Sequence, residues 1–267
     1  MMVEPLLFFL HIPKTGGMTL IWAFEDHFPP RRCWRVYTPA QAEQLLDTLS
    51  AEQRAGLRLV CGHESYCFAE HFAQPVRIVT MLRDPVRRAV SQYGHKVRDG
   101  AAAFIRTPFP EFVEGLAAGT IGPETHAGTQ SNVQVRYLAD VSPRKPVVEA
   151  HLHIALERLR SGLFAFGLTE RFPESVALFQ RVMGWSRLTV VTRNRASGPK
   201  PSLTPGQSEA LQAYHHLDVR LYQAARDHFD AQLRRAGVTP DDIRRANAPS
   251  ALQQGRLLVG RAIRKVL

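Results

Sequence analysis

The stretch LLFFLHIPKTGGMTL, Leu6–Leu20, constrains the fold more than any other part of the chain. Its first five residues form an unbroken apolar run, which is typical of a strand covered on both faces. Pro13 ends that strand. Gly16 and Gly17 then allow a tight turn before an apolar helical pattern resumes at Thr19. This order predicts backbone N–H groups, a lysine and threonine hydroxyls gathered at a helix N-terminus, where phosphate groups bind.

The order of residues in this loop separates it from the common ATP-binding loop. The Walker A motif places its lysine after its second glycine, whereas here Lys14 precedes both glycines. The sequence therefore favours phosphate binding but disfavours the ordinary ATPase design. The alternative is a plain strand-to-helix turn in which Lys14 is solvated.

A second segment of similar design follows a strand-like run at Val76–Met81. Asp84 and Pro85 are suited to cap a helix. Arg83 lies where the strand ends and Ser91 lies two turns into that helix, so both could reach one anion. An arginine fork with a hydroxyl is a good receptor for a phosphate monoester. In the alternative, Arg83 pairs with Asp84 or another carboxylate and Ser91 is a surface residue.

These motifs resemble a known family. PKTGGMT at Pro13–Thr19 and LRDPVRRAVSQY at Leu82–Tyr93 are similar to the two nucleotide-binding segments of sulfotransferases that use 3′-phosphoadenosine 5′-phosphosulfate (PAPS). With His11 and Ile12 in front, the first motif looks most like the branch of heparan sulfate and dermatan/uronyl 2-O-sulfotransferases and their bacterial relatives. The resemblance continues through CGHESY, SNVQVRYL, FGLTERFPESVALF and LDVRLYQAA, and so runs from about residue 6 to residue 235.

The resemblance implies which residues hold the donor. Lys14 would lie near the bridging oxygen, where negative charge grows as the S–O bond breaks, and would stabilise the transition state. Arg83 and Ser91 would grip the 3′-phosphate. Lys200, in the basic loop Arg193–Thr204, would add a donor contact, although an exposed basic connection is the alternative for that loop. The 5′-phosphosulfate would be bound by Lys14, Thr15, Gly16, Gly17, Met18 and Thr19, with Met18 standing where such loops more often have threonine.

His63, in GHESY, is the expected general base. It follows the apolar stretch Leu57–Cys61, so it should project at the carboxyl edge of a parallel sheet, where ligands collect. An imidazole has an ordinary pKa near 6.5, which suits a base at neutral pH, and the resemblance to the 2-O-sulfotransferases implies the same role. Glu64 is a second candidate base, and His11 could orient the site. In the alternative, His63 is a strand-end histidine held by a backbone carbonyl.

Other residues receive simpler expectations. Cys61, His63, Cys67 and His71 offer atoms that zinc prefers, but their spacing lacks the paired ligands of structural sites, so we expect no metal. We expect Arg136 near the acceptor or donor and Arg171 in a structural ion pair. His215 and His216 should be solvated on the outer face of a helix over Gln207–Phe229.

The pattern of strands and helices predicts an α/β class: a three-layer, P-loop-like fold with a central, mainly parallel sheet flanked by helices. We assign 1–238 to a sulfotransferase domain and 239–267 to a basic, helical C-terminal tail. The less regular stretch Gly100–Pro146 would contribute to acceptor binding. The expected strands are Leu6–Leu10, Leu57–Cys61, Val76–Leu82 and Leu188–Thr192.

The net charge of +10 indicates an anionic partner. We expect a hydroxyl-bearing acceptor, with an acidic glycan favoured, and no nucleic acid, because no nucleic-acid-binding signature is present. Leu252–Leu267 could lie as a basic amphipathic helix on an anionic membrane, although a docked terminal helix is the more ordinary interpretation. The sequence leaves the oligomeric state open.

A cytoplasmic location is expected from three observations. The N-terminus lacks a signal-peptide pattern, no apolar stretch is long enough to span a bilayer, and the three cysteines form no disulfide framework.

The predicted activity is PAPS-dependent sulfation of an acceptor hydroxyl. Two alternatives from other classes remain: a nucleotide- or polyanion-binding protein of the same fold without chemistry, and an ATP-using P-loop kinase.

Overall fold

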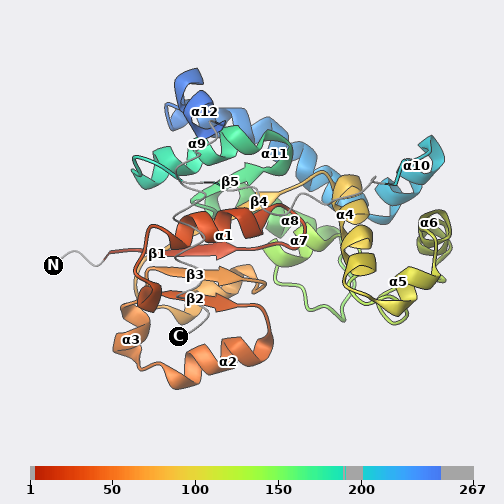
Figure 1. The fold of residues 1–267 in the computed structure, drawn as a ribbon, viewed down its shortest axis with the longest axis horizontal. Coiled ribbons are helices and arrows are strands. Elements are labelled where there is room, and N and C mark those ends of the chain that lie inside the picture. Colours follow the sequence, from red (N-terminus) through yellow and green to blue (C-terminus); the bar gives the residue numbers. More distant parts are fainter. Residues whose placement is uncertain (1–3, 189, 191–200, 248–267) are drawn as a thin grey trace.

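The computed structural model describes residues 4–188, 190 and 201–247 of the chain. Its centre is a five-stranded, wholly parallel sheet with the strand order β2-β3-β1-β4-β5 (Figure 1). The strands are β1 Leu6–Leu10, β2 Cys33–Val36, β3 Leu59–Gly62, β4 Val76–Leu82 and β5 Ala165–Leu168. The predicted α/β class with a parallel sheet is therefore confirmed.

Helices surround this sheet. Helices α4, α5, α6 and α10 lie beyond the carboxyl ends of the strands, on the right of Figure 1. Helices α2 and α3 lie beyond the β2 edge, whereas α9, α11 and α12 lie beyond the β5 edge. The bounds are α1 Gly17–Glu25, α2 Pro39–Thr48, α3 Ala51–Ala55, α4 Pro85–Arg98, α5 Ala102–Arg106, α6 Phe109–Ala118, α7 Val133–Leu138, α8 Glu149–Glu157, α9 Phe172–Met183, α10 Pro205–Tyr214, α11 His216–Arg235 and α12 Pro240–Asn247.

Strand β1 is the centre of the core because it pairs with β3 on one side and β4 on the other. Phe8 and Phe9 are completely buried, one on each face of the strand. Burying such a side chain contributes about 1.5–3 kcal/mol. The unbroken apolar run of the sequence thus follows from coverage of both sheet faces, and it fixes where the loop after β1 emerges.

Three of the four predicted strands are present, one of them with shifted bounds. Those at Leu6–Leu10 and Val76–Leu82 are confirmed, and the one at Leu57–Cys61 is present as Leu59–Gly62. Of the segment Leu188–Thr192, the described residues Leu188 and Val190 are not in a strand, and the others lie outside the described residues. Strands β2 and β5 were not predicted.

The stretch Gly100–Pro146 is more regular than expected, since it contains α5, α6 and α7. Helices α5 and α6 pack with α4 and α10 around a small apolar core of their own, separate from the core of the sheet. Phe104, Phe109, Phe112 and Leu211 are its central side chains. The proposal that this stretch binds an acceptor stays a prediction.

The start of the predicted tail is helical. Helix α12 packs against α9, while 248–267, including Leu252–Leu267, lies outside the described residues. The boundary at residue 238 and the membrane contact of the tail therefore stay proposals. Within the described part of the chain, no helix has the length and apolar character needed to cross a bilayer.

Candidate active site

The loop between β1 and α1 has the conformation that its glycines predicted. Gly16 has a φ of 84°, and Lys14 has a φ of 69°, which is uncommon for a residue with a side chain. Helix α1 begins at Gly17. The buried Thr15 hydroxyl donates to the Ile12 carbonyl over 2.8 Å. Thr15 can therefore offer a ligand its backbone N–H, whereas its hydroxyl holds the loop together.

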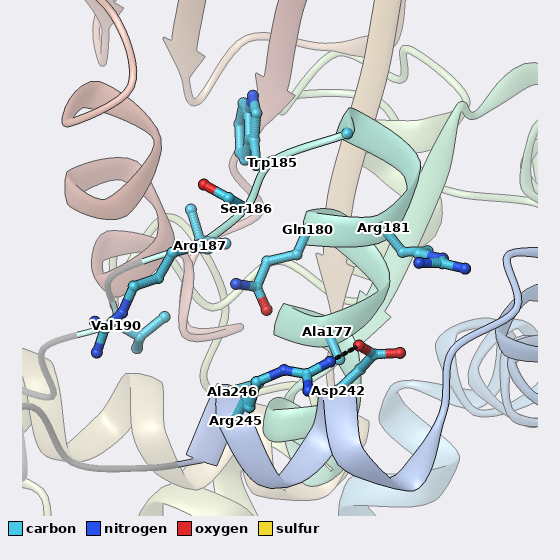
Figure 2. Close-up of a pocket in the computed structure, with 12 residues that line it drawn as sticks. Ala177, Gln180, Arg181, Trp185, Ser186, Arg187, Val190, Asp242, Arg245 and Ala246 are labelled. Atoms are coloured by element: carbon cyan, nitrogen blue, oxygen red, sulfur yellow. Dashed lines mark hydrogen bonds and ion pairs between the residues drawn. The ribbon is translucent and has the colours of Figure 1, made fainter.

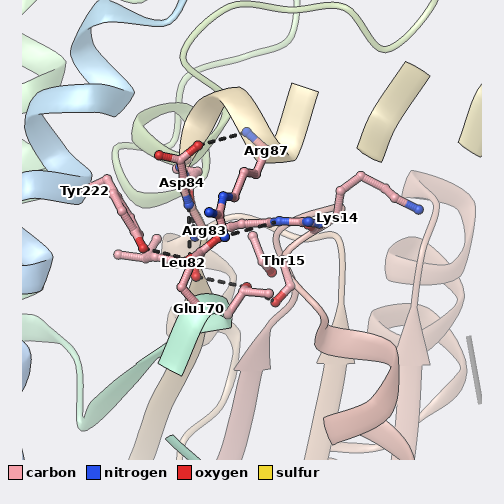
Figure 3. Close-up of polar contacts among 10 residues, drawn as sticks. Lys14, Thr15, Leu82, Arg83, Asp84, Arg87, Glu170 and Tyr222 are labelled. Atoms are coloured by element: carbon pink, nitrogen blue, oxygen red, sulfur yellow. Dashed lines mark hydrogen bonds and ion pairs between the residues drawn. The ribbon is translucent and has the colours of Figure 1, made fainter. Parts of the chain in front are cut away.

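The end of β5 and the end of β4 both clamp this loop (Figure 3). The Thr169 hydroxyl donates to the Thr15 carbonyl over 2.6 Å, and the Arg83 Nη1 donates to the Lys14 carbonyl over 2.9 Å. In Figure 3 the Lys14 side chain extends away from Arg83, so its ammonium group remains available. The two segments singled out in the sequence thus meet in space.

Arg83 is held from several directions. The side chain of Gln134 brackets its backbone, accepting from the Arg83 N–H and donating to its carbonyl, each over 2.8 Å. The Arg83 Nε lies 3.8 Å from a carboxylate oxygen of Glu170, whose other oxygen accepts from the Tyr222 hydroxyl. Arg83 therefore faces a neighbouring carboxylate, as in the alternative interpretation. Its contact with a phosphate stays a prediction.

Helix α4 starts as predicted, because the Asp84 side chain accepts from the Arg87 N–H over 2.8 Å and Pro85 occupies the first turn. Ser91 lies on this helix and is partly exposed. Met18 and Thr19 lie on the first turn of α1, and the Tyr37 hydroxyl contacts the Met18 sulfur at 3.7 Å. Lys200 lies outside the described residues.

His63 stands at the carboxyl end of β3, next to the phosphate loop. Its Nδ1 lies 2.8 Å from the His11 carbonyl oxygen. A carbonyl only accepts, so the proton is on Nδ1 and the Nε2 lone pair is left to act as a base. The imidazole stacks on the His11 ring, with 4.7 Å between centroids, and meets the Tyr37 ring at 5.2 Å. The carbonyl contact of the alternative interpretation is present, and it sets the tautomer that a base requires.

Burial keeps both histidines neutral. It lowers the pKa of His63, and nearby Lys14 lowers it further, against a rise from the hydrogen bond to the His11 carbonyl. Burial, His63 and Lys14 together lower the pKa of His11 to about 3. The backbone of the first turn of α1 also lies close to the His11 ring. A Cβ on Gly17 would be 2.1 Å from the imidazole Cδ2. Gly17 is therefore required for this close approach.

Cations crowd around the loop. Burial lowers the pKa of Lys14 to about 8, and Arg98, Arg83 and Arg88 add to that effect, while Asp99 opposes it. Burial likewise lowers the pKa of Arg83, with a further contribution from Arg87. Like charges held this close indicate a site that favours an anion.

Glu64 follows His63 and is partly buried, which raises its pKa. A raised pKa makes its carboxylate a stronger base, so this shift does not separate Glu64 from His63 as candidate bases. The structure does not test the assignment directly.

The sulfur and imidazole groups considered for zinc have separate partners. Cys61 Sγ contacts the Trp34 carbonyl at 3.8 Å, whereas Cys67 Sγ contacts Asp140 at 2.9 Å. Among the described residues, no group of three or more His, Cys, Asp or Glu side chains is placed to hold a metal ion.

Several polar residues have structural roles that sequence spacing did not reveal. Asp140, in a left-handed conformation, accepts from the Cys67 N–H and pairs with Arg158, which fixes the segment after His63. Arg136 donates to carbonyls of the turn after α7, including that of Lys145 over 2.9 Å. Arg136 therefore holds this turn together, and its position near a ligand stays a prediction.

Of the remaining expectations, those for Arg171 and His216 are confirmed and that for His215 is wrong. Arg171 pairs with Glu174 and Asp230, so its structural ion pairs are confirmed. His216 is exposed as expected, but His215 is buried and its Nδ1 accepts from the Asn132 N–H over 3.1 Å. The expectation for His215 was wrong because a break between α10 and α11 turns its side chain inward.

A hollow with a volume near 770 Å³ lies between α9 and α12, away from the predicted site residues (Figure 2). Trp185, Arg187 and the Arg245–Asp242 pair line it, and none of the predicted site residues does. Its wall also includes Leu188 and Val190, which flank residues outside the described ranges. We therefore base no function on this hollow.

Comparison with curated proteins finds several vertebrate relatives. Heparan-sulfate 6-O-sulfotransferase 1-B of Danio rerio is 27% identical, and the similarity covers 85% of this chain and 66% of the relative. Heparan-sulfate 6-O-sulfotransferase 1 of Homo sapiens is 26% identical, with the same two coverages of 85% and 66%. No model of a known protein family matches the chain.

Solved structures resemble the chain only distantly. A sulfotransferase from Alicyclobacillus acidocaldarius is 16% identical, with a TM-score of 0.45, and the similarity covers 91% of this chain and 99% of the other. A retinol dehydratase in complex with androsterone and inactive cofactor PAP is 16% identical with a TM-score of 0.34, covering 91% and 73%. Similarities this low carry no argument.

The curated relatives confirm the resemblance to heparan sulfate sulfotransferases and correct one expectation. They are named 6-O-sulfotransferases, whereas the motifs suggested the 2-O branch. The cytoplasmic expectation is contradicted by these relatives, whose names give heparan sulfate as their acceptor. The chain spans 66% of the length of these relatives, so their activity does not transfer to it without a test.

Proposed function

We propose that this chain, which resembles the heparan-sulfate sulfotransferases over most of its length, is a PAPS-dependent O-sulfotransferase. The observation that carries the proposal is the 2.8 Å contact between His63 Nδ1 and the His11 carbonyl beside the Lys14 loop. It supports a neutral imidazole with a basic Nε2 next to a cationic phosphate-type loop. Sulfuryl transfer needs this pair of groups: a base for the acceptor and a cation for the leaving phosphate.

In the proposed reaction, His63 Nε2 takes the proton of the acceptor hydroxyl. The acceptor oxygen forms a bond to sulfur as the bond between sulfur and the 5′-phosphate oxygen breaks. Lys14 and the N–H groups of the loop stabilise the negative charge on the departing phosphate. The products are the sulfated acceptor and adenosine 3′,5′-bisphosphate. The cations around Lys14 fit a donor with several anionic groups, and no step requires a metal ion.

The acceptor is proposed to be a carbohydrate hydroxyl, on an acidic glycan. The excess of positive charge and the acceptor in the names of the relatives both support this class. The proposal does not specify which hydroxyl is sulfated.

Calorimetric titration with adenosine 3′,5′-bisphosphate and with ADP tests the donor site. We expect wild type to prefer the bisphosphate and Arg83→Ala to lose most of that preference. Thr169→Val is a matched control, since it loosens the same loop without removing a cation, and should weaken both nucleotides alike. Equal binding of the two nucleotides by wild type would overturn the proposal and favour an ATP-using or non-catalytic protein.

Turnover is tested separately with PAPS and a panel of desulfated and partly sulfated glycans. Donor binding with no transfer to any acceptor, in a protein whose His63→Ala variant binds donor equally well, would favour the non-catalytic alternative.

A further inference from the structure

A second hollow lies at the start of strand β5, and none of the residues assigned to sulfuryl transfer lines it. Its volume is near 340 Å³, and small-molecule sites occupy about 300–1,000 Å³. Phe164, just before β5, lines this hollow, whereas Thr169, just after β5, clamps the donor loop. Four strand residues lie between them, so these two positions are about 16 Å apart. The hollow is therefore separate from the candidate active site.

The walls of this hollow are largely apolar. Helices α9 and α11 both pack on the edge strand β5 (Figure 1), and a short π-helical turn, Arg158–Gly162, completes the wall. Each element contributes a buried side chain to the lining, and examples are Leu159, Phe166 and Leu178. Phe164, in contrast, is 40% exposed. An apolar wall that is partly open to solvent suits the apolar body of a ligand.

The π-helical turn is an uncommon element. The Leu163 N–H donates to the Arg158 carbonyl over 2.9 Å, which is the wide hydrogen bond of such a turn. Turns of this kind are rare and occur frequently at functional sites. This one places Leu159, Arg160 and Leu163 against the hollow, while Arg158 itself pairs with Asp140. It therefore contributes both apolar groups and a cation to the same hollow.

The charges around the hollow are positive. Arg160 and Arg235 line it and are exposed, and His228 of α11 adds an imidazole. The Arg77 guanidinium lies over the ring of Phe164, 4.7 Å from its centroid. No acidic side chain among the described residues lines the hollow. Its lining therefore favours an anion.

Gln232 adds a buried hydrogen-bond donor to this lining. Its Oε1 accepts from the Phe166 N–H over 3.3 Å. Because an N–H group only donates, this contact fixes which end of the amide is the oxygen. The Nε2 is buried and has no hydrogen-bond partner among the described residues. A buried amide without a partner is costly, and an acceptor oxygen of a ligand would satisfy it.

We propose that this hollow binds a small organic anion with an apolar body and a single carboxylate or sulfate head group. The body packs against Leu163 and Phe164, and the head group accepts from Arg160, Arg235 and the Gln232 Nε2. The inference does not rest on the proposed function, since no donor or base residue takes part. The rival explanations are unspecific attraction of anions by surface arginines and an apolar hollow that does not recognise charge.

Chemical-shift titration of the backbone amides by NMR tests the inference with octanoate and octyl sulfate. Acetate carries a head group alone, and octanol carries the body alone. The variants are Arg235→Gln, which removes a charge, and Val182→Phe, which narrows the hollow and keeps its charges. Arg234→Gln is the matched control, because Arg234 is the adjacent arginine on α11, is exposed and does not line the hollow. Thermal melting of each variant reports separately on the fold.

We expect wild type to bind octanoate or octyl sulfate at least about tenfold more tightly than acetate or octanol. The largest shifts should fall at 159–166 and 228–236, the segments that line the hollow. Arg235→Gln should weaken binding about tenfold through loss of a charge-assisted contact. Val182→Phe should weaken it by about the same factor through overpacking, and Arg234→Gln should stay within about twofold of wild type.

An equal loss of affinity in Arg234→Gln and Arg235→Gln would overturn the inference in favour of unspecific attraction. Octanol that binds as tightly as octanoate would refute recognition of the head group. A wild-type protein that binds neither anion, or that shows its shifts elsewhere, contradicts the inference outright. If Arg235→Gln does not fold, Arg160→Gln decides, since Arg160 is exposed and lies on a different element. No nucleotide enters this test, so its failure leaves the proposed function untouched.

Discussion

The pKa of Lys14 makes donor binding depend on pH in a range where the nucleotide does not titrate. Burial and neighbouring arginines lower this pKa to about 8 in the free protein. Phosphate monoesters lose their second proton near pH 6, so the ligand charge is constant above pH 7.5. A bound anion favours the protonated lysine and raises its pKa in the complex.

The sign follows from linkage. Below pH 8 the free protein already carries the Lys14 proton, so affinity changes little. Above pH 8 the proton must be taken up on binding, and affinity falls with rising pH. With a pKa of about 8 in the free protein and an ordinary value near 10.4 in the complex, the loss between pH 7.5 and 9.5 is about 20-fold.

The assay is titration of adenosine 3′,5′-bisphosphate by calorimetry at pH 7.5 and 9.5, at constant ionic strength because salt screens these charges. Lys14→Arg is the control, since a guanidinium stays charged over the whole range. Its affinity should change less than about threefold. An equal loss of affinity in Lys14→Arg and wild type would refute the assignment of this pH dependence to Lys14.

Three further predictions concern His63, Gly17 and His11. His63→Ala should lower turnover about 100- to 10,000-fold with donor affinity retained. On the acid side, the wild-type rate at saturating donor should begin to fall only below pH 6.5, because burial lowers the pKa of this base; steady-state transfer rates against pH measure both effects. Gly17→Ala should cost about 1–3 kcal/mol in urea unfolding through contact with the His11 ring, whereas Gly122→Ala, with no atom near its Cβ, should change stability by less than about 0.5 kcal/mol. The pKa of His11 is near 6.5 in the unfolded chain but about 3 in the folded protein, so the free energy of unfolding decreases as the pH falls below 6.5. At pH 5 this decrease is about 2 kcal/mol. Unfolding curves at pH 7 and pH 5 measure it, and His11→Phe should not show it.

The strands predicted from sequence are those whose burial produces a simple pattern of apolar residues. Strand β1 is covered on both faces and is a continuous apolar run, and β4 is apolar and β-branched over most of its length apart from Arg77 and Thr80. Strand β2, in contrast, contains Arg35, which forms a two-pronged pair with the buried Glu25 of α1 over 2.5 and 2.6 Å. Strand β5 is four residues long and contains a glycine. Neither pattern distinguishes a strand from a loop.

The candidate site was predictable where neighbouring residues along the chain form it. The β1–α1 loop and the cap of α4 are local motifs, and both are present as expected. The residues that hold these motifs in place are far away in sequence: Glu170 faces Arg83, Gln134 brackets its backbone, and Asp218 caps α7. Such contacts depend on how helices pack across the sheet, which no local pattern encodes.

The position of the candidate base His63 relative to the candidate donor loop is set by sheet register. Leu10 of β1 pairs with Gly62 of β3, so the next residue of each strand, His11 and His63, emerges side by side. The His63 contact with the His11 carbonyl is a direct consequence, and a shift of one residue would turn the imidazole to the other face. The helices α4, α5, α6 and α10 pack around a separate apolar core. Because this core is separate from the core of the sheet, we expect substitutions there to leave His63 in place relative to Lys14.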